Sequence, residues 1–188
     1  MQFEKLKKAI PLVTLAVCTL IVSAWVKQGS KPTEVGSSQP STPAEGYTVH
    51  VTAPHVVAGK VMGPYHHYCK VLAPDPVIQC LIYESTDAKA RLSQVEFIVA
   101  KKLTRNQVPL KKWNANWHDH KIEIASGRVQ VLDMPAEKAK EVADLVSTTD
   151  GLIVHFYYDG DLPNGRTSVA QAVGHKPMSE TEFKAESK

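Results

Sequence analysis

The stretch from His66 to Ser85 constrains the fold of this 188-residue chain more than any other. It reads H-H-Y-C-K-V-L-A-P-D-P-V-I-Q-C-L-I-Y-E-S and contains two adjacent histidines and two of the three cysteines. Its second half, from Val77 to Tyr83, is an almost continuous apolar run, which is typical of a central β-strand. Pro74 and Pro76 predict a turn between the two cysteines.

Several other segments also predict β-structure. Residues 47–62 are rich in β-branched side chains and are interrupted by Pro54, so one or two short strands are expected there. Residues 92–100 and 152–158 indicate two further strands. Residues 121–125 and 128–132 alternate on either side of Ser126-Gly127, which predicts a hairpin.

The clearest helix is predicted at 134–146, with Pro135 in its first turn and Gly151 beyond its end. Residues 101–117 indicate a helical or irregular segment, which Pro109 interrupts. Its basic residues are expected on the solvent side: Lys101, Lys102, Arg105, Lys111 and Lys112. The fold class that follows is α+β, a single domain with a mixed or mainly antiparallel sheet and one or two helices.

The first 26 residues are predicted to be a signal peptide or signal anchor. A basic start, K-L-K-K, precedes an apolar run that ends at Val26. Cleavage after Ala24, lipidation at a poor lipoprotein box around Cys18, and retention as a short membrane anchor are all open. The domain boundaries that follow are a flexible Gly/Ser/Pro/Thr-rich linker at 27–46, a folded domain at 47–178 and a disordered tail at 179–188. The folded domain is therefore expected outside the cytoplasm, in the periplasm or anchored to the inner membrane.

The charge of the chain argues against nucleic acid as a partner. The first 46 residues carry five Lys against three Glu, so the rest of the chain has 17 basic and 16 acidic residues. A nearly neutral domain lacks the basic footprint that phosphate backbones require. No Walker-type loop, dinucleotide fingerprint, G-x-S-x-G elbow or H-E-x-x-H helix occurs, so the familiar nucleotide-binding and hydrolase classes lose support.

Histidines at two places predict a candidate metal site. His66 and His67 lie in the first stretch, and W-H-D-H follows with His118 and His120 about fifty residues later. Imidazole suits zinc, copper or iron, and such ions need three or four converging ligands. In a strand His118 and His120 point to one face, whereas His66 and His67 point to opposite faces, so one of the latter two is expected to join.

A hydrogen-bonded polar core that holds loops together is an equal alternative for these histidines, since their spacing matches no established zinc motif. If a metal binds, zinc is the first candidate. Asp119 and Glu123 are expected to point away from the His118–His120 pair. His155 lies alone in an apolar strand and is therefore predicted to be a core residue. The other members of the expected polar centre are His55, Glu84, Asp119 and His155.

Cys69 and Cys80 predict a disulfide, because an oxidising compartment favours pairing of two cysteines eleven positions apart. If Cys69 is oxidised, it cannot ligate a metal. A catalytic thiol at Cys69 beside His67 is a further alternative, which requires a depressed thiol pKa. The basic, tryptophan-containing segment 101–117 is compatible either with an anionic membrane surface or with an ordinary amphipathic segment whose tryptophans enter the core.

Several blocks, taken together, resemble the oil-body-associated protein family. They are H-H-Y-C at 66–69, Q-C-L-I-Y-E-S at 79–85, A-R-L-S-Q-V-E-F-I-V at 90–99, W-H-D-H-K-I-E-I at 117–124 and G-D-L-P at 160–163. The resemblance covers residues 55–178 and implies a shared fold without a known activity. This chain departs from the plant-type pattern at Lys60, where a second early histidine is expected, and at Glu84, where Asp is expected.

Two functions are therefore expected from the sequence. The first is an envelope module of the oil-body-associated type that binds a lipid surface or a protein partner. The second is a histidine-centred metal protein, with His118 and His120 joined by His66 or His67. The sequence does not decide whether the protein is an enzyme, and it leaves the oligomeric state open.

Overall fold

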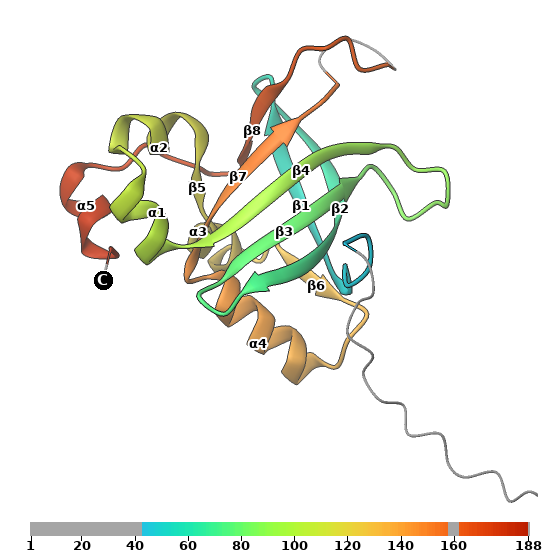
Figure 1. Cartoon of the computed structure of the whole chain (residues 1–188), viewed down its shortest axis with the longest axis horizontal. Helices are drawn as coiled ribbons and strands as arrows, with labels where there is room; N and C mark the ends of the chain where they lie inside the picture. The colour runs from blue at the N-terminus through green and yellow to red at the C-terminus, as the bar shows by residue number, and fades with distance from the viewer. Residues whose placement is uncertain (1–42, 158–161, 188) are drawn as a thin grey trace, which may run out of the picture. The chain divides into compact units, whose positions relative to one another are not determined.

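The structure is a computed structural model that describes residues 43–157 and 162–187. The signal or anchor segment predicted at 1–26 and the linker up to residue 42 lie outside the described residues. The ordered elements in Figure 1 begin at Val49 and end at Ala185.

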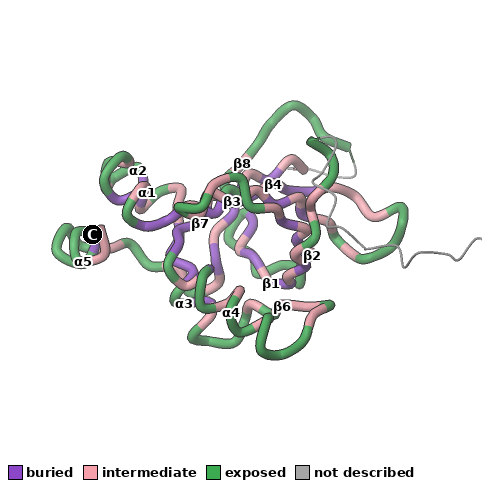
Figure 2. The backbone as a smooth tube through the Cα atoms, turned by 60° about the horizontal axis from the view of Figure 1, so that its bottom comes forward, coloured by how far each residue is buried: buried purple, intermediate pink, exposed green. Residues whose placement is uncertain are grey.

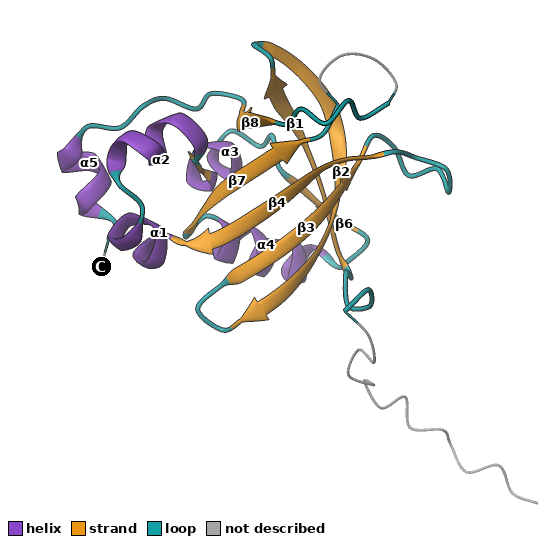
Figure 3. Cartoon of the chain, turned by 45° about the horizontal axis from the view of Figure 1, so that its top comes forward, coloured by secondary structure: helices purple, strands orange, loops and turns teal. Residues whose placement is uncertain are grey.

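Six antiparallel strands form a closed sheet. They are β1 (Val49–Val57), β2 (Lys60–Ala73), β3 (Val77–Tyr83), β4 (Leu92–Ala100), β7 (Thr149–His155) and β8 (Ser168–Ala172). Each strand pairs with the next in the order β1-β2-β3-β4-β7-β8, and β8 pairs with β1, which closes a barrel (Figure 3). The prediction of a single α+β domain with a mainly antiparallel sheet is confirmed, and the structure adds that the sheet closes into a barrel.

The core lies inside the barrel. Side chains alternate across each strand, so every second residue points inward, and Figure 2 shows the buried residues concentrated along the barrel strands. The buried apolar cluster combines all six strands: Val57, Tyr65, Cys69, Ile78, Cys80, Ile82, Ile98, Ile153 and Ala170. Polar side chains that follow the same inward alternation therefore enter a space that has little contact with water.

Residues 118–132 complete the barrel wall, because β8 is too short to do so alone. β5 (His118–Asp119) pairs with β7 beyond the end of β8, and β6 (Gln130–Leu132) pairs with β1 in the same way. The helix α3 (His120–Ala125) lies between them. The hairpin predicted at 121–132 is wrong, because the Asp119 side chain accepts from the Lys121 backbone N–H at 2.8 Å and caps a helix there.

The described residues contain four more helices: α1 (Lys101–Gln107), α2 (Leu110–Asn116), α4 (Ala136–Val146) and α5 (Glu180–Ala185). This exceeds the one or two helices expected. The tail predicted to be disordered forms α5, because Ser179 and Glu182 make a capping box and Phe183 packs on Trp113 with ring centroids 5.6 Å apart. None of the helices in the described ranges is long and apolar enough to cross a membrane.

Two basic residues expected in solvent are buried instead. Lys101 and Arg105, in α1, are 6% and 5% exposed, and Trp113, in α2, is fully buried. Arg105 donates to carboxylate oxygens of both Asp119 and Asp150 at 2.9 Å. The exposure prediction failed because these acids, distant in sequence, supply buried partners for the cations.

Cys69 and Cys80 form a disulfide between directly paired residues of β2 and β3. The predicted pairing is confirmed. Both residues are buried. Oxidation removes Cys69 as a thiolate metal ligand and as a nucleophile, so the two thiol alternatives are excluded in this state.

Glu186, just after α5, joins the C-terminal segment to the domain. Its carboxylate contacts Lys101 at 2.6 Å and Lys121 at 2.9 Å. Burial opposes its ionisation, but the two lysines outweigh burial and lower the pKa of Glu186 to about 2. A carboxyl group with a depressed folded-state pKa stabilises the fold above its ordinary pKa, and this contribution is lost as the pH falls toward 2.

We therefore expect Glu186→Gln to lower the free energy of unfolding at pH 7 by about 1 kcal/mol, a small value because the side chain is partly in water. The difference should shrink below pH 4.5 and vanish near pH 2. Urea unfolding over this pH range measures it. Glu141→Gln, which removes the exposed carboxylate of an ion pair on α4, is the control and should change the free energy of unfolding by at most a few tenths of a kcal/mol at any pH. A pH-independent difference for Glu186→Gln would contradict the ion-pair interpretation.

Candidate metal centre

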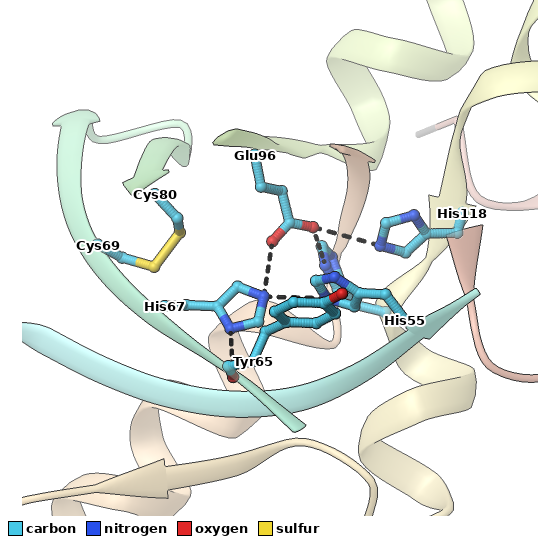
Figure 4. Close-up of a disulfide and its surroundings, with 8 residues drawn as sticks. His55, Tyr65, His67, Cys69, Cys80, Glu96 and His118 are labelled. Carbon is cyan, nitrogen blue, oxygen red and sulfur yellow. Dashed lines mark hydrogen bonds and ion pairs between the residues drawn. A yellow bond between two sulfur atoms is a disulfide. The ribbon is translucent and has the colours of Figure 1, made fainter. Parts of the chain in front are cut away.

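Four histidines and one glutamate meet inside the barrel. His55 comes from β1, His67 from β2, Glu96 from β4, His118 from β5 and His120 from the first position of α3. Each of the five is at most 3% exposed. Figure 4 shows the Glu96 carboxylate between His67 and His118, with the disulfide nearby.

The ring Nε2 atoms face the carboxylate. Oε1 of Glu96 lies 3.1 Å from Nε2 of His120 and 3.3 Å from Nε2 of His118. Oε2 lies 3.7 Å from Nε2 of His67, which in turn lies 3.1 Å from Nε2 of His55. Glu96, His118 and His120 form the one group of three in the described part of the chain whose donor atoms lie close enough together to hold a metal ion.

The other ring nitrogen of three of these histidines is held by an acceptor. Nδ1 of His55 lies 2.6 Å from the Gln94 amide oxygen, and Nδ1 of His67 lies 3.2 Å from the Tyr65 carbonyl oxygen. Nδ1 of His120 lies 2.9 Å from Oγ1 of Thr149, whose own hydroxyl donates to the Val146 carbonyl. The Tyr65 carbonyl can only accept, so Nδ1 of His67 carries a proton and the lone pair of the neutral ring is on Nε2.

Burial and neighbouring charges set the protonation of the cluster. Burial opposes ionisation of Glu96, but the imidazoles of His118 and His120 hold its pKa well below the ordinary value. Burial likewise opposes a charge on His120, but the Glu96 carboxylate raises the pKa of His120. Burial lowers the pKa of His67, and burial together with His67 lowers the pKa of His55 to about 3. Glu96 is thus ionised while His55 and His67 are neutral.

Glu123 also reaches the cluster, although a strand would have turned it away. In α3 it lies three residues after His120 and so on the same helix face. Its Oε2 is 3.7 Å from Nε2 of His118, and burial raises the pKa of Glu123. Its Oε1 has no hydrogen-bond partner among the described residues.

Asp119 points away from the cluster, as expected, and fixes the two histidines that flank it. Its carboxylate accepts from Arg105 at 2.9 Å and contacts Lys101 at 2.7 Å. These contacts lie on the outer side of β5. Because neighbouring strand residues face opposite ways, the ion pairs on Asp119 direct His118 toward the barrel interior.

Three other residues expected near this centre lie elsewhere. His66 faces the outside of β2, where its Nδ1 lies 3.0 Å from Nε2 of His50. Glu84 forms a bidentate ion pair with Arg91 at 2.7 and 2.9 Å. His155 is buried in β7 outside this group. The structure thus brings together His55, His67, His118 and His120, and adds Glu96 and Glu123.

Glu96 was missed by sequence reasoning, although one signal was present. It is the one acidic residue in the otherwise mainly apolar run L-S-Q-V-E-F-I-V-A. A charged residue in the middle of a buried strand needs a compensating partner. Its inward direction was hidden because Val95 and Phe97, on the other face, are also apolar.

A small cavity of about 80 Å³ adjoins the cluster. His55, His67, Glu96 and His120 line one part of it, and apolar residues of β1, β3 and β4 line most of the rest. Val142, Leu145 and Val146 of α4 also line it, as do residues of β2, Glu123 and Val129. The polar cluster therefore faces a mainly apolar cavity between α4 and the barrel strands.

Comparison with known proteins gives a consistent family match. A family described as a protein of unknown function (DUF1264) matches residues 41–187. The chain is 33% identical over 111 residues to "Oil body-associated protein 1B" of Arabidopsis thaliana, which covers 57% of this chain and 45% of that protein. It is 31% identical over 139 residues to "Oil body-associated protein 1A" of Zea mays, and this match covers 68% of this chain and 57% of that protein. The chain thus spans about half the length of these relatives. No solved structure matches.

Gly151 makes room for the cluster. A Cβ atom at this position would lie less than 3.0 Å from Oε1 of Glu96 and from Nε2 of His118. We expect Gly151→Ala to lower the free energy of unfolding by roughly 1–3 kcal/mol, because the packed carboxylate and ring must move. Urea unfolding measures this loss. The ring nitrogen NMR signals of His118 and His120 should shift, whereas those of His50 and His66 serve as the control; unchanged His118 signals would contradict this geometry.

Proposed function

Since the chain belongs to the DUF1264 family of oil-body-associated proteins, for which no activity is described, we propose a function from the site itself: the domain binds a divalent transition-metal ion through Glu96, His118 and His120. These residues supply one carboxylate oxygen and two imidazole nitrogens. Donor atoms about 2.1 Å from a common ion lie about 3.0–3.5 Å apart at bond angles of 90–110°. The distances from Oε1 of Glu96 to His118 and His120, 3.3 and 3.1 Å, fall in this range.

The observation that carries the proposal is the convergence of three buried donor atoms: a carboxylate oxygen of Glu96 and one ring nitrogen each of His118 and His120 lie within 4.8 Å of one another. Nε2 of His120 lies 3.1 Å from Oε1 of the ionised Glu96, which favours a cation between them. In the metal-free chain a proton on His120 can take this place, consistent with its raised pKa, and a metal ion satisfies the same requirement.

The donor set favours zinc or another first-row transition metal over calcium or magnesium, because imidazole nitrogens are poor ligands for the latter ions. Three protein ligands leave at least one coordination position open, as in catalytic rather than structural zinc sites. Such a position supplies Lewis-acid chemistry to a bound molecule. The apolar cavity below α4 favours a small ligand with an apolar body and one polar end at the ion.

Metal analysis of the gently purified, full-length protein tests this proposal. We expect at least one ion per chain in the unaltered protein, and a loss of about one ion in His118→Gln. His118 is suited to substitution because His120 stays 3.1 Å from Oε1 of Glu96 as its buried partner; circular dichroism of His118→Gln checks that the domain is folded.

His66→Gln is the matched control, because it removes a histidine from the outer face of β2 and should keep the full metal content. Less than about 0.2 ion per chain in the unaltered protein would refute metal binding. Full retention of metal by His118→Gln would refute the assigned ligands.

We also propose, as a second candidate, that the domain contacts lipid surfaces through the tip of the β1–β2 hairpin. Val61 and Met62 are 64% and 44% exposed there, next to the exposed Lys60. Two neighbouring apolar side chains in water favour contact with an apolar phase. The names of the relatives associate those proteins with oil bodies, which supports a lipid surface over a protein partner.

Vesicle flotation tests this candidate. The full-length protein should float with phosphatidylcholine vesicles, and the double variant Val61→Ser/Met62→Ser should float several-fold less because it loses the apolar contact. Val71→Ser/Leu72→Ser, which removes exposed apolar side chains from the opposite end of β2, is the control. Equal flotation of both double variants would exclude the hairpin tip as the contact.

A further inference from the structure

The carboxyl group of Glu123 has one oxygen without a partner. Its Oε2 lies 3.7 Å from Nε2 of His118, whereas Oε1 is buried and makes no hydrogen bond within the described residues. A buried polar atom that lacks a hydrogen bond is costly to the fold. The missing partner is therefore expected in the space that Glu123 borders.

That space is the cavity between α4 and the barrel strands, and its walls differ from place to place. His67, Glu96 and Glu123 line it and are buried. Val71 and Leu145 also line it, but these apolar side chains are exposed. Because side chains that border the cavity also reach water, the mouth of the cavity lies beside Val71 and Leu145. The cavity thus has a buried polar end and an apolar mouth.

Water alone does not suit this cavity. A buried water molecule is held by two to four polar partners, whereas apolar side chains such as Val49, Ile78 and Ile98 line most of the walls. A hydrocarbon group fills such a space favourably. The volume of about 80 Å³ is about half that of an engineered cavity of about 150 Å³ that binds benzene. It therefore encloses a chain of about three or four carbons, and the end of a longer chain reaches the mouth.

A hydroxyl group is the polar end that fits best. Glu96 already has the imidazoles of His118 and His120 as partners, so it does not require a further cation, and an ammonium group would lose its water at high cost. A carboxylate would add another acid beside Glu96 and Glu123 and has no hydrogen to donate. A hydroxyl group is neutral and both donates and accepts, so it matches the unpartnered oxygen of Glu123.

We propose that the cavity binds a primary aliphatic alcohol, whose hydroxyl group donates to Oε1 of Glu123 and whose chain lies between α4 and the barrel strands. This site goes beyond the proposed metal binding and needs no ion, because its contacts are with Glu123 and the apolar walls. The affinity should rise about fourfold per methylene group up to about 1-butanol. Longer chains should gain less, because their ends reach water at the mouth.

Titration of the metal-free, full-length protein with 1-hexanol tests the site through the methyl NMR signals of Leu145 and Val146. Val142→Phe fills the cavity from α4 and should weaken binding at least tenfold. Asp144→Phe places the same ring at an exposed position of α4 and should leave binding unchanged. Hexanoate and hexylammonium should bind at least tenfold more weakly than 1-hexanol.

No saturable shift in the unaltered protein, or equal binding by Val142→Phe, would overturn the cavity as the alcohol site. Tighter binding of hexanoate or hexylammonium would overturn the hydroxyl group as its polar end. None of these results changes the metal content that tests the proposed function, so the two proposals fail separately.

Two variants at Glu123 test the polar contact. Glu123→Gln keeps an acceptor oxygen and should bind 1-hexanol within about twofold of the unaltered protein. Glu123→Leu removes the acceptor and should bind about tenfold more weakly. Circular dichroism checks that both variants are folded. An unchanged affinity in Glu123→Leu would overturn the contact with Glu123.

Discussion

The interior of this domain depends on one buried carboxylate. Glu96 is 3% exposed, in a barrel whose other inward-facing residues are mostly apolar. An isolated charge in such a place costs many kilocalories per mole, so it persists only with partners of opposite charge. The imidazoles of His118 in β5 and His120 in α3 supply these partners, and a metal ion would neutralise the same group more completely. The barrel strands thus place polar side chains around Glu96, although a core held together by apolar packing alone would not need them.

A second buried network holds one half of that centre in place. Arg105 bridges Asp119, on the outer side of β5, and Asp150 in β7, and Trp113 also donates to Asp150 at 2.9 Å. Removing either acid would leave the guanidinium, whose side chain is fully buried, with one buried carboxylate fewer to compensate its charge. This network aligns β5 beside β7, and the helix cap at Asp119 starts α3 there. The positions of His118 and His120 therefore follow from charges that lie outside the site.

Local patterns predicted much of the fold. The apolar runs at 77–83 and 92–100 are strands, the periodic segment at 134–146 contains a helix, and Pro109 separates two helices. Cys69 and Cys80 pair because a turn between two strands makes them direct neighbours. The strand predicted at 121–125 is wrong, because the alternating sequence K-I-E-I-A is compatible with a strand and also with a short helix. The helix cap at Asp119 decides in favour of the helix.

The sequence by itself determined the strand-rich class, the disulfide and the residue types available for a site, because these depend on local periodicity and on neighbours a few residues apart. It also indicated that His66 and His67 face opposite ways. Only the tertiary structure decided that His67 is the inward member, that His55 joins it and that Glu96 is the common partner. These relations depend on strand register and on closure of the sheet, which bring residues 55, 67, 96 and 118 together across more than sixty positions of sequence.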